Sequence, residues 1–568
     1  MKRNKLLGMT VFAVTAAVVA SGCSAGGQNA ADTGDRAKVT ESKVTLDPSG
    51  ADSKGPAPEV SGSRPGGTIN VLWRQDIVHY DAAVIQSSPD ATVSEFIQRR
   101  LTMYKVDGDR KILVGDLATN SGETTDSGKT WKYTLKDGVK YADGSPIKAQ
   151  DVKYAVARSF SSKYARGFPY IQTWLAGSDE FTKVYPGPYE GGELSNDKVE
   201  TPDDKTIIFK FSEPRPDFPF AAALGTTVPV PQAKDTKEAL DQNPITSGPY
   251  KIASHEVDKS LKLVRNENWD PKTDPIRHQF VDGYNFQFGP QVAEVTDRLS
   301  ASAGDDRNST SLYQAIAPER LDQVLNDPKL KAQVVDTPTS QSNVYSINTT
   351  RVTDLNVRKA ILTAFPKEQA RQVQGGPYMA DFATTLGSPA NLGWAKYDLP
   401  GVTDVDPKGN PEKAKQMLTD AGKLGYSISL GYTQTPSSEK EALVVADGLE
   451  KAGFKVEKIP MQSKTFLEAR DTVNNNLDLY WSAWAADWPT GVTVYPELYD
   501  GRKVADGRPN NSHFNDPAVN DAIDKALKIT DPAEQGAEFM KIDKMIMEKV
   551  PAIPYLFPRR QLMVGSNV

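Results

Sequence analysis

Cysteine and histidine are scarce in this chain, and their scarcity limits the chemistry that it can carry. With Cys23 as the only cysteine in 568 residues, the chain can form neither an internal disulfide nor a thiolate zinc site. The four histidines are not spaced as metal ligands on one helix would be. Motifs of metalloproteases, of serine hydrolases and of phosphate loops are also absent. The sequence therefore predicts no metal site, no cofactor and no enzymatic activity.

Basic residues are not in excess either. The chain has 67 Lys and Arg against 73 Asp and Glu, a net charge of −6, whereas binding to nucleic acid needs a basic face. We therefore predict no nucleic-acid partner. The hydrophobic share of 38% and the charged share of 25% are typical of a soluble globular chain. The length allows about two to four domains.

Long hydrophobic runs are missing except near the start of the chain. Basic residues within positions 2–5 precede a mostly apolar stretch over residues 6–20, which is shorter than the ~20 residues of a membrane-spanning helix. Small residues follow this stretch and lead into Cys23. This order predicts an export signal over residues 1–22.

The small residues before Cys23 resemble the lipobox of bacterial lipoproteins. In that motif the thiol receives a diacylglyceryl group, and cleavage makes the cysteine the first residue. The resemblance implies that Cys23 is lipidated and that the protein is extracytoplasmic, anchored to the outer face of the bacterial cell membrane. The alternative is an ordinary secretory signal with an incidental free cysteine, which is disfavoured because an unpaired exported thiol is a liability.

Residues 24–66 contain no aromatic residue and few large aliphatic ones, and are rich in Gly, Ser, Ala, Asp and Pro. A segment of this composition cannot bury enough apolar surface to offset the entropy lost on ordering. We therefore predict that residues 23–66 form a lipidated, disordered tether between the membrane and the folded body.

The folded body is predicted to begin near Gly67 with a strand at Thr68–Trp73, where β-branched residues alternate with others. From residue 343 onward strands and helices alternate, which predicts an α/β domain with a sheet flanked by helices. The expected strands there are 343–349, 427–432, 455–459, 477–483 and 553–557. The expected helices there are 354–365, 411–421, 437–452, 464–472, 516–527 and 532–549.

Five separated parts of the sequence are similar to the motifs of one family, in the family's order. They are residues 131–152, 246–250 with 263–269, 355–361, 411–422 and 484–489. In the first, the turn pairs Asp137-Gly138 and Asp143-Gly144 precede Asp151 in the first turn of a helix, where a negative charge is favoured. On these motifs the chain resembles family 5 of the ABC transporter solute-binding proteins, the oligopeptide, dipeptide and nickel cluster, and above all the oligopeptide-binding proteins.

The resemblance implies an α/β, periplasmic-binding-protein-like fold of the type II, cluster C class, with two lobes, an extra inserted domain and a ligand cleft between the lobes. The domains implied are discontinuous. Their expected bounds are 67–95, 201–290 and 551–568 for domain I, 96–200 for the inserted domain II, and 291–550 for domain III.

The resemblance also implies where ligand binds. In the peptide-binding relatives the Asp of a Trp-x-Ala-Asp-Tyr segment pairs with the free amino terminus of the peptide, and the matching residue here is Asp487. Its neighbours Trp484, Ala485 and Trp488, and the residues Trp73 and Gln75 at the end of the first strand, are the other candidate ligand contacts. The alternative is that Asp487 caps a turn and that the tryptophans belong to the core.

The function implied is that of a monomeric receptor that binds peptides and hands them to ABC permease subunits driven by a cytoplasmic ATPase. One alternative keeps the fold and changes the solute to an oligosaccharide, an opine, haem or a metal complex, since fold does not fix ligand. Another is a receptor that senses peptides for signalling. A tethered hydrolase is disfavoured because no nucleophile and base set is recognisable.

Overall fold

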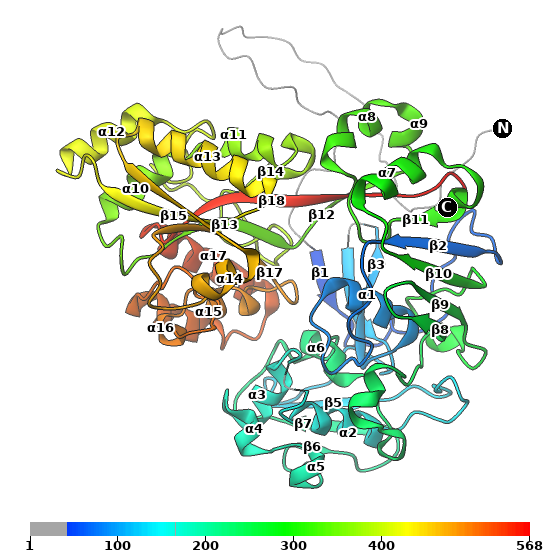
Figure 1. Cartoon of the computed structure of the whole chain (residues 1–568). Coiled ribbons are helices and arrows are strands. Elements are labelled where there is room, and N and C mark those ends of the chain that lie inside the picture. The colour runs from blue at the N-terminus through cyan, green and yellow to red at the C-terminus, as the bar shows by residue number, and fades with distance from the viewer. Residues whose placement is uncertain (1–42, 109, 165) are drawn as a thin grey trace, which may run out of the picture.

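The computed structural model describes residues 43–568 except 109 and 165, so the predicted signal at 1–22 and Cys23 lie outside the described residues. Figure 1 shows three bodies, at the upper right, the lower right and the left. We call them domains I, II and III, and define each by its sheet. In the part of the chain that the structure describes, no helix combines the length and the apolar character that crossing a bilayer requires.

Domain I is built on a mixed sheet with the strand order β11-β2-β10-β9-β8. The strand predicted at Thr68–Trp73 is β2, and it runs parallel to β10. Val71 and Trp73 on one face of β2 join the core beneath α1. The other elements of domain I are α1 (Ser88–Ile97), β8 (Tyr250–Glu256), β9 (Ser260–Arg265), β10 (Gly283–Phe288), α7 (Val292–Ala301), β11 (Ser309–Thr310), α8 (Leu321–Asn326) and α9 (Pro328–Lys331).

Domain II holds the sheets β1-β4-β3 and β5-β7-β6. The helix predicted to begin at Asp151 is α2 (Ala149–Ser159), and the Asp151 carboxylate accepts a hydrogen bond from the Lys148 backbone N–H at 3.0 Å. The other elements are β1 (Lys43–Leu46), β3 (Thr102–Asp107), β4 (Arg110–Gly115), β5 (Thr130–Thr134), α3 (Tyr170–Ala176), α4 (Phe181–Val184), α5 (Pro188–Gly191), β6 (Val199–Glu200), β7 (Thr206–Lys210) and α6 (Phe218–Ala221).

Domain III is an α/β body whose sheet has the order β12-β18-β13-β17-β15-β16, with β14 added on β18. In Figure 1 helices α10–α13 lie above this sheet and α14–α17 lie below it. Its strands are β12 (Val334–Pro338), β13 (Gln341–Ile347), β14 (Ala380–Phe382), β15 (Ser427–Thr433), β16 (Lys455–Met461), β17 (Leu479–Ala485) and β18 (Ala552–Met563). Its helices are α10 (Leu355–Ala364), α11 (Lys367–Val373), α12 (Pro411–Asp420), α13 (Pro436–Lys451), α14 (Ser463–Arg470), α15 (Tyr495–Leu498), α16 (Pro517–Ala526) and α17 (Pro532–Met547). The predicted alternation from residue 343 is confirmed, and so is the α/β fold class.

Strand β18 connects domain III to domain I and is more than twice as long as the strand predicted at 553–557. Its first half pairs with β13, its second half pairs with β12, and the next residue, Val564, bridges to Thr310 of the domain I sheet. In Figure 1 it runs from the left body to the right one. The crossing between domains I and III therefore consists of the antiparallel strand pair β12 and β18.

The prediction of a disordered tether is wrong for residues 43–66, which belong to the folded body. β1 lies parallel to β4, and the buried Asp47 carboxylate accepts hydrogen bonds from Ser49 Oγ at 2.9 Å and Ser53 Oγ at 2.7 Å. Ser53 Oγ in turn accepts from the Gly115 backbone N–H at 2.8 Å. Pairing with β4, burial of Val44 in the domain II core and hydrogen bonds around one carboxylate hold this segment in place, and composition does not reveal these contacts.

Several predicted domain borders fall inside packed units, and the border at residue 95 cuts helix α1. The border at residue 200 separates β6 from β7, which are hydrogen-bonded neighbours in one sheet. The border at residue 291 assigns α7 to domain III, yet Val295 and Leu299 of α7 pack with Leu72 of the domain I sheet. The sheets and cores therefore indicate that domain II extends beyond the predicted border at residue 200. They also indicate that domain I continues past residue 291 to the start of β12.

Candidate ligand-binding site

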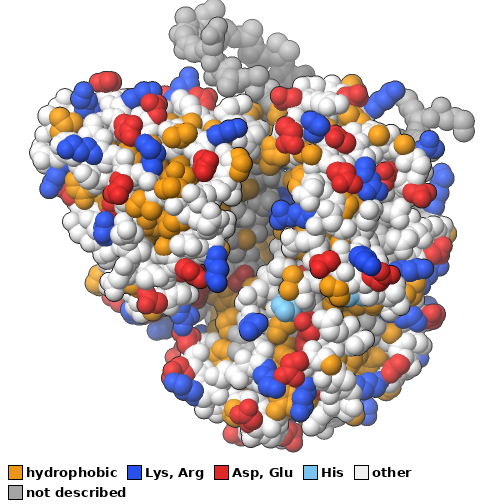
Figure 2. Space-filling model, in the orientation of Figure 1, with side chains coloured by type: hydrophobic (Ala, Val, Ile, Leu, Met, Phe, Trp, Pro, Cys, Tyr) orange, Lys and Arg blue, Asp and Glu red, His pale blue; other side chains and the backbone are white. Residues whose placement is uncertain are grey.

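A groove separates domain III from domains I and II, as Figure 2 shows. The segment that follows β17 reaches across to domain II. We call residues 484–494 the β17 loop, which ends at the residue before α15. This loop contains four of the predicted ligand contacts, Trp484, Ala485, Asp487 and Trp488.

Asp487 is half-buried in the β17 loop and is bonded to domain II. The hydroxyl of Tyr170 on α3 donates a hydrogen bond to Oδ2 of Asp487, and the Asp487 backbone N–H donates to Thr493 Oγ1 at 3.1 Å. Burial raises the pKa of Asp487 to about 6, although the hydrogen bond from Tyr170 opposes the rise. Among the described residues no further hydrogen bond reaches this carboxylate. At neutral pH the group is therefore mostly ionised, and its Oδ1 is able to accept from a cation.

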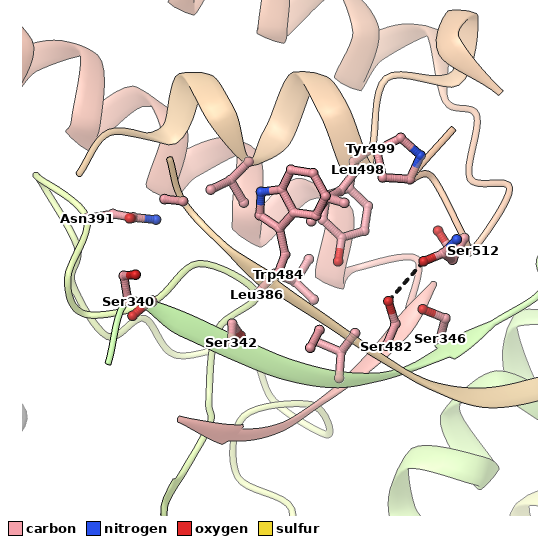
Figure 3. Close-up of a pocket in the computed structure, with 17 residues that line it drawn as sticks. Ser340, Ser342, Ser346, Leu386, Asn391, Ser482, Trp484, Leu498, Tyr499 and Ser512 are labelled. Carbon is pink, nitrogen blue, oxygen red and sulfur yellow. Dashed lines mark hydrogen bonds between the residues drawn. The ribbon is translucent and has the colours of Figure 1, made fainter. Parts of the chain in front are cut away.

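Trp484 lies on the domain III side of the loop and lines a pocket, which Figure 3 shows. Its indole N–H donates to the Thr493 carbonyl at 2.7 Å, so Thr493 holds both Trp484 and Asp487 in place. Ser342 on β13 lies directly opposite Trp484 in the strand register. The next residue, Ala485, ends β17 and is exposed. The pocket and the Asp487 carboxylate thus belong to the same end of β17.

Trp488 does not line the groove. Its side chain is only 2% exposed and packs edge-on against Tyr170 and Trp174 of domain II, with ring centroids 4.5 and 6.0 Å away. In this conformation it is a buried contact between domains III and II, so the alternative reading of a core tryptophan describes it better than the predicted ligand contact.

Trp73 and Gln75 also differ from one another. Trp73 is 7% exposed and its ring packs edge-on against Tyr313 in the domain I core, so a ligand in the groove does not reach it in this conformation. Gln75, two residues on, is exposed. The two differ because Trp73 is the last residue of β2 and packs in the domain I core, whereas Gln75 stands beyond the end of the strand.

Three residues of this region were not predicted from the sequence. Tyr170 is the partner of Asp487, and Asn391 and Asn511 line the pocket beside Trp484. Asn391 stands in a turn-rich loop with Gly387 and Gly393, a pattern that indicates a loop but not its neighbours. The loop signal was visible in the sequence, whereas the partnership of Tyr170 and Asp487 spans 317 positions and was not.

The arrangement favours binding over bond chemistry. It offers one carboxylate at Asp487, a half-buried indole at Trp484 and serine and asparagine side chains, which are suited to hydrogen bonds and to packing against apolar groups. In the part of the chain that the structure describes, no group of three or more potential metal ligands gathers anywhere.

Comparison with known proteins finds similarity along most of the chain. The model of the bacterial extracellular solute-binding proteins, family 5 middle domain, matches residues 113–506. The periplasmic oligopeptide-binding protein OppA of Escherichia coli is 25% identical over 86% of this chain and 88% of its own length. The probable D,D-dipeptide-binding periplasmic protein DdpA of the same organism is 24% identical, over 86% and 88%.

A solved structure with the same fold is that of clavulanic acid biosynthesis oligopeptide binding protein 2. It superimposes with a TM-score of 0.80 at 27% sequence identity, covering 93% of this chain and 95% of the other. The two-lobed periplasmic-binding-protein-like fold predicted from the sequence is thereby confirmed.

Proposed function

Because the chain belongs to family 5 of the bacterial extracellular solute-binding proteins, we propose that it is the peptide receptor of an ABC importer. In this proposal the protein is a monomer anchored outside the cell membrane by lipid on Cys23. It takes up peptides between domains I and III and passes them to permease subunits that a cytoplasmic ATPase drives. Its own action is binding and closure, without enzymatic chemistry.

The observation that carries the proposal is the Asp487 carboxylate. It is half-buried, it stands at the end of a strand beside a pocket, and one of its oxygens has no hydrogen-bond partner among the described residues. An ammonium group that enters a closed cleft needs a carboxylate partner, because an unpaired charge is costly away from water. A peptide amino terminus supplies such an ammonium. The names of the relatives OppA and DdpA, which refer to peptides, support the same ligand class.

The fold supplies a means of closure. Domains I and III are joined by the strand pair β12 and β18, so bending there brings the two sides of the groove together. Hinge motions of this kind act through a few residues at the ends of elements. We propose that domains I and II move as one lobe and that domain III moves as the other. The borders between the domains are then those indicated by the hydrophobic cores and sheets described above.

The test is peptide binding by Asp487→Asn. The variant should bind peptides with free amino termini more weakly by about 2–5 kcal/mol, because the ammonium keeps its burial and loses its counter-charge. N-acetylated peptides should bind the variant and the parent protein equally. Isothermal titration calorimetry with a matched pair of free and acetylated peptides measures both effects.

Tyr170→Phe is the matched control. It removes the same hydrogen bond between domains that Asp487→Asn weakens, and it leaves the carboxylate in place. If Tyr170→Phe loses as much affinity as Asp487→Asn, the carboxylate acts by holding the domains together and not by binding the amino terminus. If neither variant changes the affinity for free peptides, the role proposed for Asp487 is wrong.

A further inference from the structure

The pocket beside Trp484 has an unusual lining for the inner face of a sheet. Ser342, Val344 and Ser346 lie on one face of β13, and Ser482 and Trp484 lie on the same face of β17, since Ser342 pairs with Trp484 and Val344 with Ser482. Inward positions of a covered sheet are usually filled by large apolar side chains. Serine at three of these five positions puts hydroxyl groups where methyl groups would be expected.

The other walls of the pocket are equally neutral. They come from the loop with Ser388 and Asn391, from α15, and from the segment with Asn511 and Ser512. Lys, Arg, His, Asp and Glu are all absent from the residues that line it. In Figure 3 the indole of Trp484 stands in the middle of the pocket, and a hydrogen bond of 2.9 Å joins Ser482 to Asn511. A charged group entering this pocket would find no counter-charge.

Two of the polar side chains are buried without partners. Asn391 is 4% exposed, and neither its amide nitrogen nor its amide oxygen makes a hydrogen bond. Ser342 is 6% exposed, and its hydroxyl likewise has no partner. Buried polar groups in native proteins are nearly always hydrogen-bonded, because leaving them unpaired is costly. The serines at 388, 482 and 512 do have hydrogen bonds, which sets Asn391 and Ser342 apart.

We propose that Asn391 and Ser342 form a subsite that selects a small, neutral, hydrogen-bonding side chain of the bound peptide, such as a carboxamide or a hydroxyl. The inference rests on the proposed function and narrows its ligand class. Asn391 offers a donor and an acceptor side by side, which complements a carboxamide, and Ser342 adds a hydroxyl that serves as either. The absence of charge in the lining disfavours acidic and basic side chains, and the two unpaired groups disfavour apolar ones.

The test uses a set of tetrapeptides with free amino termini. In an all-alanine parent peptide, each position in turn is replaced by Asn, Ser, Leu, Asp or Lys, and affinities are measured by isothermal titration calorimetry. At one position Asn and Ser should bind about tenfold more tightly than Leu, Asp or Lys, because only they satisfy the buried groups. In Asn391→Leu this preference should disappear, whereas the all-alanine peptide should keep its affinity.

Asn474→Leu is the control, because Asn474 is an exposed asparagine of the same domain outside the pocket, and it should keep the preference. Equal affinities at every position, or a preference that survives in Asn391→Leu, overturn the subsite; water is then the partner of the two groups. If the parent protein binds no peptide at all, the proposed function fails and the subsite with it. If peptides bind without selection, only the subsite fails.

Discussion

The buried carboxylates at the two interfaces of domain II are partnered in opposite ways, and the ion pair that does cross to domain III, Arg508 with Asp179, is exposed. At its junction with domain I, the fully buried Asp116 carboxylate accepts hydrogen bonds from Arg99 Nε at 2.7 Å and from two nitrogens of Arg277 at 3.0 Å. At its contact with domain III, the buried Asp217 accepts a long hydrogen bond of 3.4 Å from Thr490 and faces the indole of Trp488, and Asp487 accepts a hydrogen bond from Tyr170. Among the described residues, neither Asp217 nor Asp487 has a cationic partner.

The pKa values show the consequence. Burial acts to raise the pKa of Asp116, but the guanidinium groups of Arg277 and Arg99 outweigh burial and hold it well below the usual range. At the other contact burial dominates and raises the pKa of Asp217 to about 7, although hydrogen bonding to Trp488 and Thr490 opposes the rise. Paired charges suit a permanent junction, because removing either partner leaves a buried charge. Unpaired carboxylates and aromatic packing suit a contact that opens, since both sides can return to water without leaving a buried ion behind.

The largest expected effect comes from breaking the permanent junction with Asp116→Asn. The change removes a negative charge that pairs with Arg99 and Arg277 in a buried site. We therefore expect the free energy of unfolding to fall by about 3–5 kcal/mol. Denaturation with urea, followed by circular dichroism, measures it.

Asp107→Asn is the matched control for that change. Asp107 pairs with Arg110, but the two side chains are 54% and 50% exposed, so its loss should cost less than about 1 kcal/mol. Equal costs for the two variants would mean that the paired charges do not hold domains I and II together.

The fold also shows which elements could be predicted from the sequence alone. Elements with strong local signals were predicted well: the β-branched strand at Thr68–Trp73, and helix α12, which begins at Pro411 behind the cap Asn410. The length of β18 was not predicted, because Pro554 and Pro558 are unfavourable in a central strand. Pairing with β13 and β12 overrides that local preference, and such pairing is not visible in the sequence.

The candidate site follows the same rule. The strand that precedes Asp487 was predicted from the segment itself, whereas the choice of Asp487 and Trp484 as ligand contacts came from the family resemblance. The packing of Trp488 in the core of domain II was not predicted, because its aromatic partners Tyr170 and Trp174 lie more than 300 positions earlier in the sequence. Local pattern thus located the loop, whereas the direction of each side chain depended on contacts distant in sequence.

A smaller effect is expected from Trp488→Ala, which breaks the contact between domains II and III. Removing a buried tryptophan costs about 3–4 kcal/mol of packing and cavity energy, but here separation of the domains relieves part of the cost. We therefore expect domain III to swing away from domain II, and the radius of gyration measured by small-angle X-ray scattering to increase.

Trp394→Ala supplies the comparison for that experiment. Trp394 is 9% exposed and packs against Phe557 within domain III, so its loss should destabilise that domain without separating it from domain II. A similar radius of gyration in both variants would show that Trp488 contributes to stability only, and not to the position of domain III.

The smallest effect is a response to pH that should appear at one contact and not at the other. A carboxyl whose pKa is raised stabilises the folded contact only while it is protonated, so stability contributed by Asp217 is lost as pH rises toward and through 7. Between pH 5 and pH 8 the loss amounts to about 2.5 kcal/mol. Asp116, whose pKa is lowered, contributes fully above its unfolded pKa near 4 and loses stability only below it, so the junction with domain I is unaffected over this range. The radius of gyration should therefore grow from pH 5 to pH 8, and Asp217→Asn should abolish most of the change, leaving the part due to Asp487. An undiminished response in Asp217→Asn would assign the sensitivity to another group and remove the electrostatic distinction between the two contacts.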